Sequence, residues 1–380
     1  MTELEAIIRG EILQMGSIRF DRFMDLALNH PLYGYYTRRQ ERPRTGREGD
    51  FFTSVSVGPL FGRLLARQFF QMWQAMGKPV PFSIVEQGAN DGQLACDILS
   101  WCQNETPEFF EAAHYEIVEP SITLRTFQQR RIEEARFSQK AAWFLQASLM
   151  AGENPVGVFF SNELVDAFPV RLVTRKNGEW RELQVALGGE TGFVWLDRPL
   201  DDGELADAVK ILSLPTIEGY TTEINLRARS WMEELGRVLL CGYVLTLDYG
   251  FPASIYFADF RVGGTLTAYL NHRRTEEILV NPGLRDITAH VDFTALARAG
   301  EKAGLTTLGF VDQHHFLMGI AHDELSKKEG PRAGITESLR AWNTLTHPNH
   351  LGARFHALLQ AKDAPSGLDG LRFARSTADF

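Results

Sequence analysis

One loop in the sequence has residue types and spacing that suit the binding of a small cofactor. Residues 84–94 read Ile-Val-Glu-Gln-Gly-Ala-Asn-Asp-Gly-Gln-Leu, so an apolar run ends at Glu86 and is followed by Gly88, Asn90 and Gly92. Glycine permits a tight turn between a strand and a helix and lets a ligand approach the backbone closely. We therefore expect Gly88 and Gly92 to line a cofactor site, and an ordinary strand-to-helix turn is the alternative.

A second acidic residue, Glu119, ends the next apolar run, HYEIVE at residues 114–119. In doubly wound sheets an acid at this place can accept hydrogen bonds from both ribose hydroxyls of a nucleoside cofactor. An NAD dehydrogenase more typically carries Gly-x-Gly-x-x-Gly with its acid about 20 residues further on, and Asn90 interrupts that pattern. The loop also offers few backbone amides for a pyrophosphate. These features favour a cofactor without phosphates, S-adenosylmethionine, although Glu119 can also be read as a solvated acid at a strand end.

Three polar side chains lie at the end of a third apolar run, VGVFFSNE at residues 156–163. Asn162 offers an amide oxygen to a substrate nitrogen, and the carboxylates of Glu163 and Asp166 suit a guanidinium group. Asp166 follows Glu163 by three residues, so both face one way if a helical turn begins here. The same residues are good helix caps, and both interpretations can hold together.

Further candidates for chemistry follow later in the chain. Asp248 ends the apolar run YVLTLDYG at residues 243–250, so we expect it to face the same crevice, with a simple turn as the alternative. His272, His290 and Asp292 lie within or just after a long irregular segment. Histidine can accept a proton near neutral pH. A structural role, such as capping the helix that follows Asp292, is the alternative.

The elements that must position these residues follow a strand–helix rhythm. Short apolar runs near residues 82–88, 114–119 and 156–163 alternate with expected helices at 92–103 and 121–136. This pattern predicts a parallel sheet with crossover helices, and WFLQA adds a short strand. Asn177-Gly178 then lies between two alternating runs, which predicts a hairpin and an antiparallel insertion after Pro169.

Helices are expected at both ends of the chain. The N-terminal part is predicted as two helices over residues 3–30, a basic loop at 37–50 and a helix at 58–77. After a helix at 222–237 and the strand at 243–250, we expect a helix at 292–304 and strands near 306–311 and 314–319. Residues 331–362 are expected to be helical and to form an appended element.

These elements predict an α/β, doubly wound, mostly parallel seven-stranded sheet with one reversed strand near the carboxyl end. The expected divisions are an N-terminal helical extension, 1–80; a Rossmann-like core, 81–169 and 222–320; an antiparallel insertion, 170–221; and a C-terminal helical appendage, 321–380.

The composition narrows the class of partner. The 380 residues carry a net charge of −9 and are 44% hydrophobic, as in an ordinary globular protein, and the acidic balance argues against nucleic acid as a partner. The 3 cysteines include no Cys-x-x-Cys, so neither a disulfide scaffold nor a metal site is expected. The chain shows no signal peptide, and no apolar run reaches the roughly 20 residues that span a bilayer. We therefore expect a cytoplasmic protein without membrane insertion.

Short motifs are spread over roughly residues 15–320. They are Phe23-Met24, His30-Pro31, Gly34-Tyr35-Tyr36, Gly49-Asp50-Phe51-Phe52-Thr53-Ser54, Phe61-Gly62, the Glu86 loop, Asn162-Glu163-x-x-Asp166-Ala167-Phe168-Pro169-Val170, Asp248-Tyr249-Gly250, Gly264-Thr265-Leu266, His272, Asp286-Ile287-Thr288 and His290-Val291-Asp292-Phe293. In their number and order these motifs resemble those of MidA-type S-adenosylmethionine-dependent methyltransferases, a family that includes the mitochondrial arginine methyltransferase of complex I assembly. The family's loop usually reads Glu-x-Gly-Pro-Gly-x-Gly, and this chain has Ala89 and Asn90 at the Pro-Gly positions.

The resemblance implies a class I methyltransferase fold, S-adenosylmethionine as cofactor and arginine of a protein as methyl acceptor. With the residues above, it assigns cofactor binding to Phe52, Thr53, Ser54, Glu86, Gly88, Asn90, Gly92, Leu94, Glu119 and Asn162, and catalysis to Asn162, Glu163, Asp166, Asp248 and His272. A small-molecule methyltransferase with a closed pocket, and a partner-binding assembly factor with weak or lost catalysis, remain alternatives. A homodimer is left open.

Overall fold

The computed structural model describes residues 1–38, 53–189, 192–201, 203–270, 273–325 and 339–374. The chain forms two compact units. The first comprises Met1–Phe51, Val165–Ser230 and Phe251–Asp292, and the second Phe52–Leu164, Trp231–Gly250 and Phe293–Phe380. These bounds differ from the expected divisions, because residues 53–80 belong to the unit with the parallel sheet and residues 251–292 belong to the other unit.

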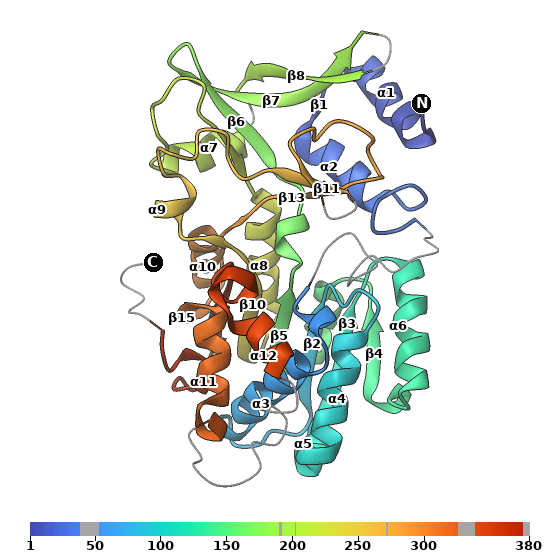
Figure 1. Ribbon diagram of the computed structural model, residues 1–380, viewed down its shortest axis with the longest axis vertical. Coiled ribbons are helices and arrows are strands. Elements are labelled where there is room, and N and C mark those ends of the chain that lie inside the picture. Colours follow the sequence, from blue (N-terminus) through green and yellow to red (C-terminus); the bar gives the residue numbers. More distant parts are fainter. Residues whose placement is uncertain (39–52, 190–191, 202, 271–272, 326–338, 375–380) are drawn as a thin grey trace. The chain divides into compact units, whose positions relative to one another are not determined.

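Seven strands of the second unit form a mostly parallel sheet (Figure 1). Their order is β15 (Thr306–Asp312), β16 (Phe355–Lys362), β10 (Cys241–Phe251), β5 (Val156–Asn162), β2 (Phe82–Gln87), β3 (Ala113–Val118) and β4 (Ala141–Phe144). The five strands from β10 to β4 pair in parallel, whereas β16 is antiparallel to both of its neighbours. The expected sheet with one reversed strand near the carboxyl end is therefore confirmed.

Helices cover both faces of this sheet because side chains alternate along each strand. Leu245 and Leu247 of β10 pack in the apolar core with α3 (Leu60–Ala75), α4 (Gln93–Glu105) and α11 (Gln313–Leu325). On the opposite face, Gln360 of β16 donates a hydrogen bond to the Ala297 carbonyl of α10 (Phe293–Lys302), 2.9 Å away.

The remaining helices of this unit are short or lie at its edges. They are η1 (Val55–Val57), α5 (Pro107–Ala112), α6 (Ile122–Glu134), η2 (Ser138–Lys140), η3 (Ala147–Glu153), the second half of α8 (Leu226–Val238), α12 (Leu339–Thr346), η6 (Pro348–Gly352) and η7 (Asp369–Leu371).

Two expectations for the C-terminal part are wrong. Residues 314–319, expected as a strand, lie in α11, and residues 355–362, expected as part of a helical appendage, form β16 between β15 and β10. Each segment contains only a short apolar run, Phe316–Met318 or Ala357–Leu359, and a run of that length does not distinguish a buried strand from a buried helix.

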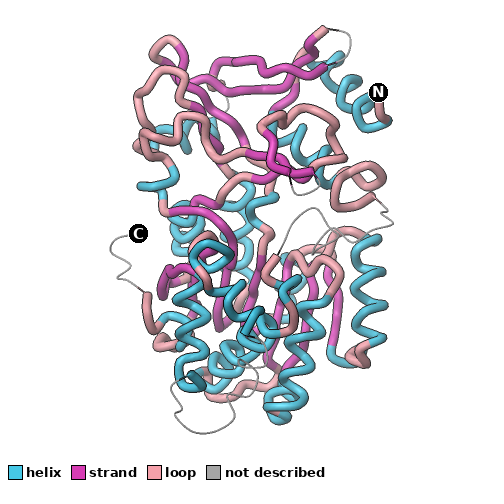
Figure 2. Tube along the Cα trace, viewed as in Figure 1, coloured by secondary structure: helices cyan, strands magenta, loops and turns pink. Residues whose placement is uncertain are grey.

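The first unit is built around an antiparallel sheet, seen as the long magenta strands in Figure 2. Strand β7 (Glu179–Gly188) pairs with β6 (Arg171–Lys176), β8 (Gly192–Pro199) and β1 (Ile18–Arg19), and β6 also pairs with β9 (Thr221–Ile224). Asn177 and Gly178 adopt φ angles of 53° and 77° in the turn between β6 and β7. Both residue types tolerate this left-handed conformation, which confirms the expected hairpin and antiparallel insertion.

Shorter elements complete the first unit. They are α1 (Glu3–Met15), α2 (Phe20–Asn29), η4 (Val165–Ala167), α7 (Gly203–Ile211), the first half of α8, α9 (Ala253–Tyr256), β14 (Val291–Asp292) and a three-stranded sheet of β12 (Arg273–Thr275), β11 (Thr267–Leu270) and β13 (Asp286–Thr288).

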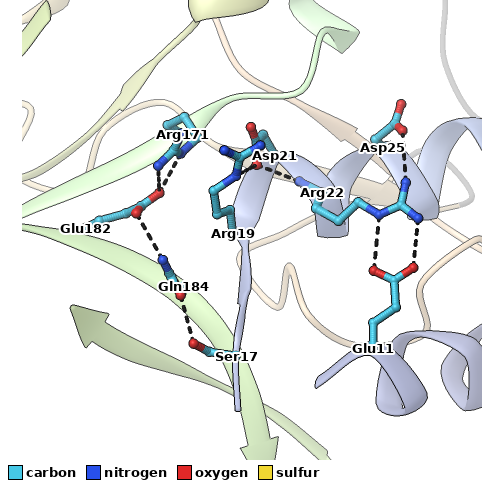
Figure 3. A network of polar contacts seen from close by, with 9 residues as sticks. All are labelled: Glu11, Ser17, Arg19, Asp21, Arg22, Asp25, Arg171, Glu182 and Gln184. Atoms are coloured by element: carbon cyan, nitrogen blue, oxygen red, sulfur yellow. Dashed lines mark hydrogen bonds and ion pairs between the residues drawn. The ribbon is translucent and has the colours of Figure 1, made fainter. Parts of the chain in front are cut away.

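A polar network joins several of these elements (Figure 3). The buried Arg171 of β6 pairs with Glu182 of β7, which accepts a hydrogen bond from Gln184, and Gln184 in turn accepts one from Ser17. Nearby, Arg22 of α2 pairs with Glu11 of α1. The Ser17 contact ties the segment after α1 to the sheet, and the Arg22–Glu11 pair joins α2 to α1.

Candidate cofactor and acceptor site

The loop after β2 requires glycine at two positions. Gly88 and Gly92 both have φ of +83°. A Cβ atom on Gly88 would lie 3.0 Å from Leu164 Cδ1, and one on Gly92 would lie 3.3 Å from Gln128 Cα. A side chain at either position would therefore be strained in its backbone and crowded by its neighbours.

The two residues that replace Pro-Gly fit this loop. Ala89 is buried in the apolar core, as is the expected cofactor residue Leu94 in the first turn of α4. Asn90 has φ of +47°, a left-handed conformation that asparagine adopts more readily than most residues. The loop thus keeps the backbone path that glycine would otherwise provide.

Glu86 points into the core beneath this loop. Its side chain is 2% exposed, and the Tyr115 hydroxyl donates a 2.7 Å hydrogen bond to Glu86 Oε2. Burial raises the pKa of Glu86 to about 7, the Tyr115 hydrogen bond opposes this rise, and the negative charge of Asp91 adds to it. The Glu86 side chain is therefore held in the core by Tyr115 of the neighbouring strand β3.

Glu119 lies at the end of β3, beside the loop. Gln87 and Val118 are register partners, which places Glu119 next to Gly88 at the carboxyl ends of two adjacent strands. Its Oε1 accepts from the Ser121 backbone N–H at 2.8 Å, and its Oε2 accepts from Gln128 Nε2 at 3.1 Å. Burial raises the pKa of Glu119, and these hydrogen bonds lower it. Its carboxylate is fixed in orientation.

Asn162 and Glu163 follow at the end of β5. Glu163 Oε1 accepts hydrogen bonds from Asn162 Nδ2 and from the Ser54 backbone N–H, each at 3.1 Å. Asn162 Oδ1 is buried and has no hydrogen-bond partner among the described residues. Glu163 has φ of +53°, a backbone conformation that costs energy in a glutamate. At this strand end, Asn162 Oδ1 is thus a buried acceptor that a ligand could satisfy.

Three other expected residues, Asp248, Ser54 and Thr53, form hydrogen bonds with other groups of the protein. Asp248 is fully buried, and its two oxygens accept from the backbone N–H groups of Leu164, at 3.2 Å, and Tyr249, at 2.9 Å. Ser54 Oγ donates to Gln313 Oε1 at 3.1 Å, and Thr53 Oγ1 accepts from the Ser56 N–H at 3.1 Å. These contacts hold the backbone around the site.

The expected cluster of Asn162, Glu163 and Asp166 is divided between the two units. Asp166 belongs to the first unit, where its carbonyl accepts from the Ala289 N–H at 2.9 Å and its charge helps to raise the pKa of the buried Tyr36, after burial itself and Asp286.

The expected histidines, His272 and His290, and the expected cofactor residue Phe52 remain to be placed. His290 also lies in the first unit, and its backbone N–H donates to Thr265 Oγ1 at 3.0 Å. His272 and Phe52 lie outside the described residues.

Sequence reasoning missed three residues at this end of the sheet. Gln128 contacts both the loop and Glu119, and Ser121 donates to Glu119. Ile122, which directly follows Ser121, is 78% exposed. Helix α6, which carries Gln128, has no clear apolar stripe, so no pattern in the sequence marks one of its polar residues as buried.

The sequence similarity to curated relatives extends over most of this chain. The protein arginine methyltransferase NDUFAF7 homolog of Drosophila melanogaster is 27% identical over 92% of this chain and 83% of its own length. The protein arginine methyltransferase NDUFAF7 of Rattus norvegicus is 27% identical over 97% of this chain and 87% of its own length. That of Homo sapiens is 26% identical over 91% of this chain and 80% of its own length.

The names of these relatives correct one expectation. All three are described as mitochondrial, which contradicts the cytoplasmic location expected from the sequence. As for membranes, no helix in the described part of the chain combines the length and the apolar character needed to span one.

A solved structure and a family model establish the family. A COG1565 superfamily member from Burkholderia thailandensis, bound to S-adenosyl-homocysteine, has a TM-score of 0.87 and 30% identity, and the match covers 99% of this chain and 96% of that one. The model of a family described as "Putative S-adenosyl-L-methionine-dependent methyltransferase" matches residues 64–311. Such a cofactor fits the loop of Gly88 and Gly92 and the oriented Glu119 carboxylate. The Asn162 oxygen, which has no hydrogen-bond partner among the described residues, suits a methyl acceptor. The chain belongs to this family and is an S-adenosylmethionine-dependent methyltransferase.

Proposed function

We propose that the protein methylates an arginine side chain of a protein substrate. The curated relatives named as protein arginine methyltransferases support this acceptor. When bound, S-adenosylmethionine supplies a methyl group that is already activated on a positively charged sulfur. The protein's part is therefore to hold both reactants, to orient the acceptor nitrogen and to exclude water.

The cofactor side of the site is assigned to the loop of Gly88 and Gly92 and to Glu119. Each oxygen of Glu119 accepts one protein hydrogen bond and keeps a lone pair for a ribose hydroxyl. The exposed Ile122 offers an apolar surface beside it for the adenine ring. Glu86, which lies under the loop, is assigned to support the loop rather than to contact the cofactor.

The acceptor side is assigned to Asn162, and one observation carries this proposal. Asn162 Oδ1 is a buried acceptor without a partner among the described residues, and such a group is costly unless a ligand satisfies it. Glu163 accepts the Asn162 amide N–H, so the oxygen is left to accept from a guanidinium N–H. Glu163 thereby positions Asn162 and also holds Ser54.

The test compares Asn162→Ala with Asn104→Ala, a control on the exposed side of α4. We expect Asn162→Ala to lower methyl transfer to an arginine-containing peptide by about 100-fold, as when one orienting group is removed from an active site. Binding of S-adenosylhomocysteine should change by less than about threefold, because the hydrogen bond that is removed is one to the methyl acceptor and not to the cofactor. Normal turnover of Asn162→Ala, or transfer by wild type to lysine peptides but not to arginine peptides, would refute the proposal.

A further inference from the structure

Gln128 connects two parts of the cofactor side that come from different strands. Its side chain, on α6, is fully buried. Gln128 Nε2 donates to the Asn90 carbonyl at 2.9 Å and to Glu119 Oε2 at 3.1 Å. The loop after β2 and the acid after β3 are therefore held by one amide group.

The orientation of this amide follows from its third contact. Trp143 Nε1 lies 3.2 Å from Gln128 Oε1, and an indole N–H can only donate a hydrogen bond. The amide oxygen must therefore face Trp143. The amino group, with its two hydrogens, is left to face two acceptors, a backbone carbonyl and a carboxylate.

The helix that carries Gln128 is itself held close to the site. Ser121 caps α6, because its side chain accepts from the Leu124 N–H at 3.3 Å, while the Ser121 N–H donates to Glu119. Gly92 lies so near that a Cβ atom there would be 3.3 Å from Gln128 Cα. The loop, Glu119 and α6 thus form one connected group.

We propose that Gln128 is a positioning residue for S-adenosylmethionine, which fixes the Glu119 carboxylate and the Asn90 peptide in the arrangement that receives the cofactor. This inference rests on the proposed contact of Glu119 with the ribose. Without Gln128, Glu119 would lose the hydrogen bond to its Oε2 and could rotate about its remaining bond from Ser121, and the left-handed Asn90 would lose the bond that holds its carbonyl. Cofactor binding would then have to order both groups.

The experiment measures the dissociation constant of S-adenosylhomocysteine by calorimetry for wild type, Glu119→Gln, Gln128→Leu and the double variant. Leucine is close to glutamine in size but donates nothing. We expect Gln128→Leu to weaken binding about 10-fold and Glu119→Gln about 10-fold, as for one hydrogen bond to a charged group. If Gln128 acts through Glu119, the double variant should lose clearly less than the product of the two, by a factor of at least about 3.

Controls separate this role from a purely structural one. Gln129→Leu changes the exposed neighbour on the same helix and should leave the affinity unchanged. If Gln128→Leu does not fold, Gln128→Glu keeps the size and the Trp143 contact but sets a carboxylate against Glu119, and it should weaken binding at least as much. Normal affinity of a folded Gln128 variant, or losses that multiply fully in the double variant, would overturn the proposal.

The outcome is independent of the methyl acceptor. Unchanged binding in Glu119→Gln would refute the ribose assignment, whereas weakened binding in Glu119→Gln with normal binding in Gln128→Leu would refute the role of Gln128 alone. Neither result depends on arginine methylation, because S-adenosylhomocysteine binds without a substrate peptide.

Discussion

Two buried carboxyl groups, Glu86 and Glu119, lie at adjacent strand ends, and their surroundings set them apart. Glu86 is directed into the apolar core, where the Tyr115 hydroxyl donates a hydrogen bond to it. Glu119 instead accepts from a backbone N–H and an amide at the edge of the loop. The first environment favours a neutral acid near neutral pH, and the second favours an oriented carboxylate.

The raised pKa of Glu86 makes stability depend on pH. Burial raises this pKa from 4.5 to about 7, so the folded protein binds a proton more tightly than the unfolded chain, and the free energy of unfolding falls as pH rises between these values. The full shift corresponds to about 3 kcal/mol. Glu86→Gln removes this titration, so its stability relative to wild type should rise by that amount from pH 4.5 to pH 8.

Urea denaturation at both pH values measures this difference. Glu105→Gln, an exposed acid at the end of α4, is the control and should show no such change. If the stability difference between Glu86→Gln and wild type is the same at both pH values, Glu86 is not the titrating group.

At the scale of elements, the antiparallel sheet carries a buried ion pair between β6 and β7. The side chains of Arg171 and Glu182 are 3% and 5% exposed. Glu182→Ala leaves a buried guanidinium without its carboxylate and should cost about 3–5 kcal/mol. Replacing both, in Arg171→Met with Glu182→Leu, removes both charges and should cost much less than the single change.

Chemical denaturation of these variants tests the burial argument. The control is Asp207→Ala, which breaks the exposed pair with Lys210 on α7 and should cost less than about 1 kcal/mol. Equal losses in Glu182→Ala and Asp207→Ala would show that the buried pair contributes no more than a surface one.

At the scale of the whole molecule, the end of the chain completes the sheet that the cofactor loop belongs to. Strand β16 pairs with β10 on one side and β15 on the other, and Leu359 is fully buried. Leu359→Asp would place an unpaired charge in the core and should prevent folding. Leu339→Asp on α12, at a side chain that is 56% exposed, should be tolerated.

Size-exclusion chromatography and thermal unfolding distinguish the two variants. A monodisperse Leu359→Asp protein with a wild-type melting temperature would restore the view of residues 331–362 as an appendage. Loss of folding in Leu359→Asp but not in Leu339→Asp is the expected result, because β16 lies between β15 and β10 and pairs with both.

The sequence by itself determined the features that depend on neighbouring residues. Gly88 and Gly92 mark the turn because its left-handed backbone conformation favours glycine, and Asn177-Gly178 marks the hairpin for the same reason. The apolar runs that end in Glu119 and Asn162 predict strand ends, and parallel pairing brings such ends to one edge of a sheet. The motif order along the chain also predicted the family, which the comparisons confirm.

Tertiary structure alone decided the features that depend on distant residues. Gln128 lies in a polar helix, and its burial arises from contacts with Asn90, Glu119 and Trp143, which come from three other segments. One partner of Glu163 is Ser54, more than a hundred positions away, so this contact of its carboxylate could not be assigned from spacing. Strand β16 reads equally well as a buried helix until β10 and β15 supply its pairing. Local patterns fix backbone conformation, whereas burial and hydrogen-bond partners are set by the fold as a whole.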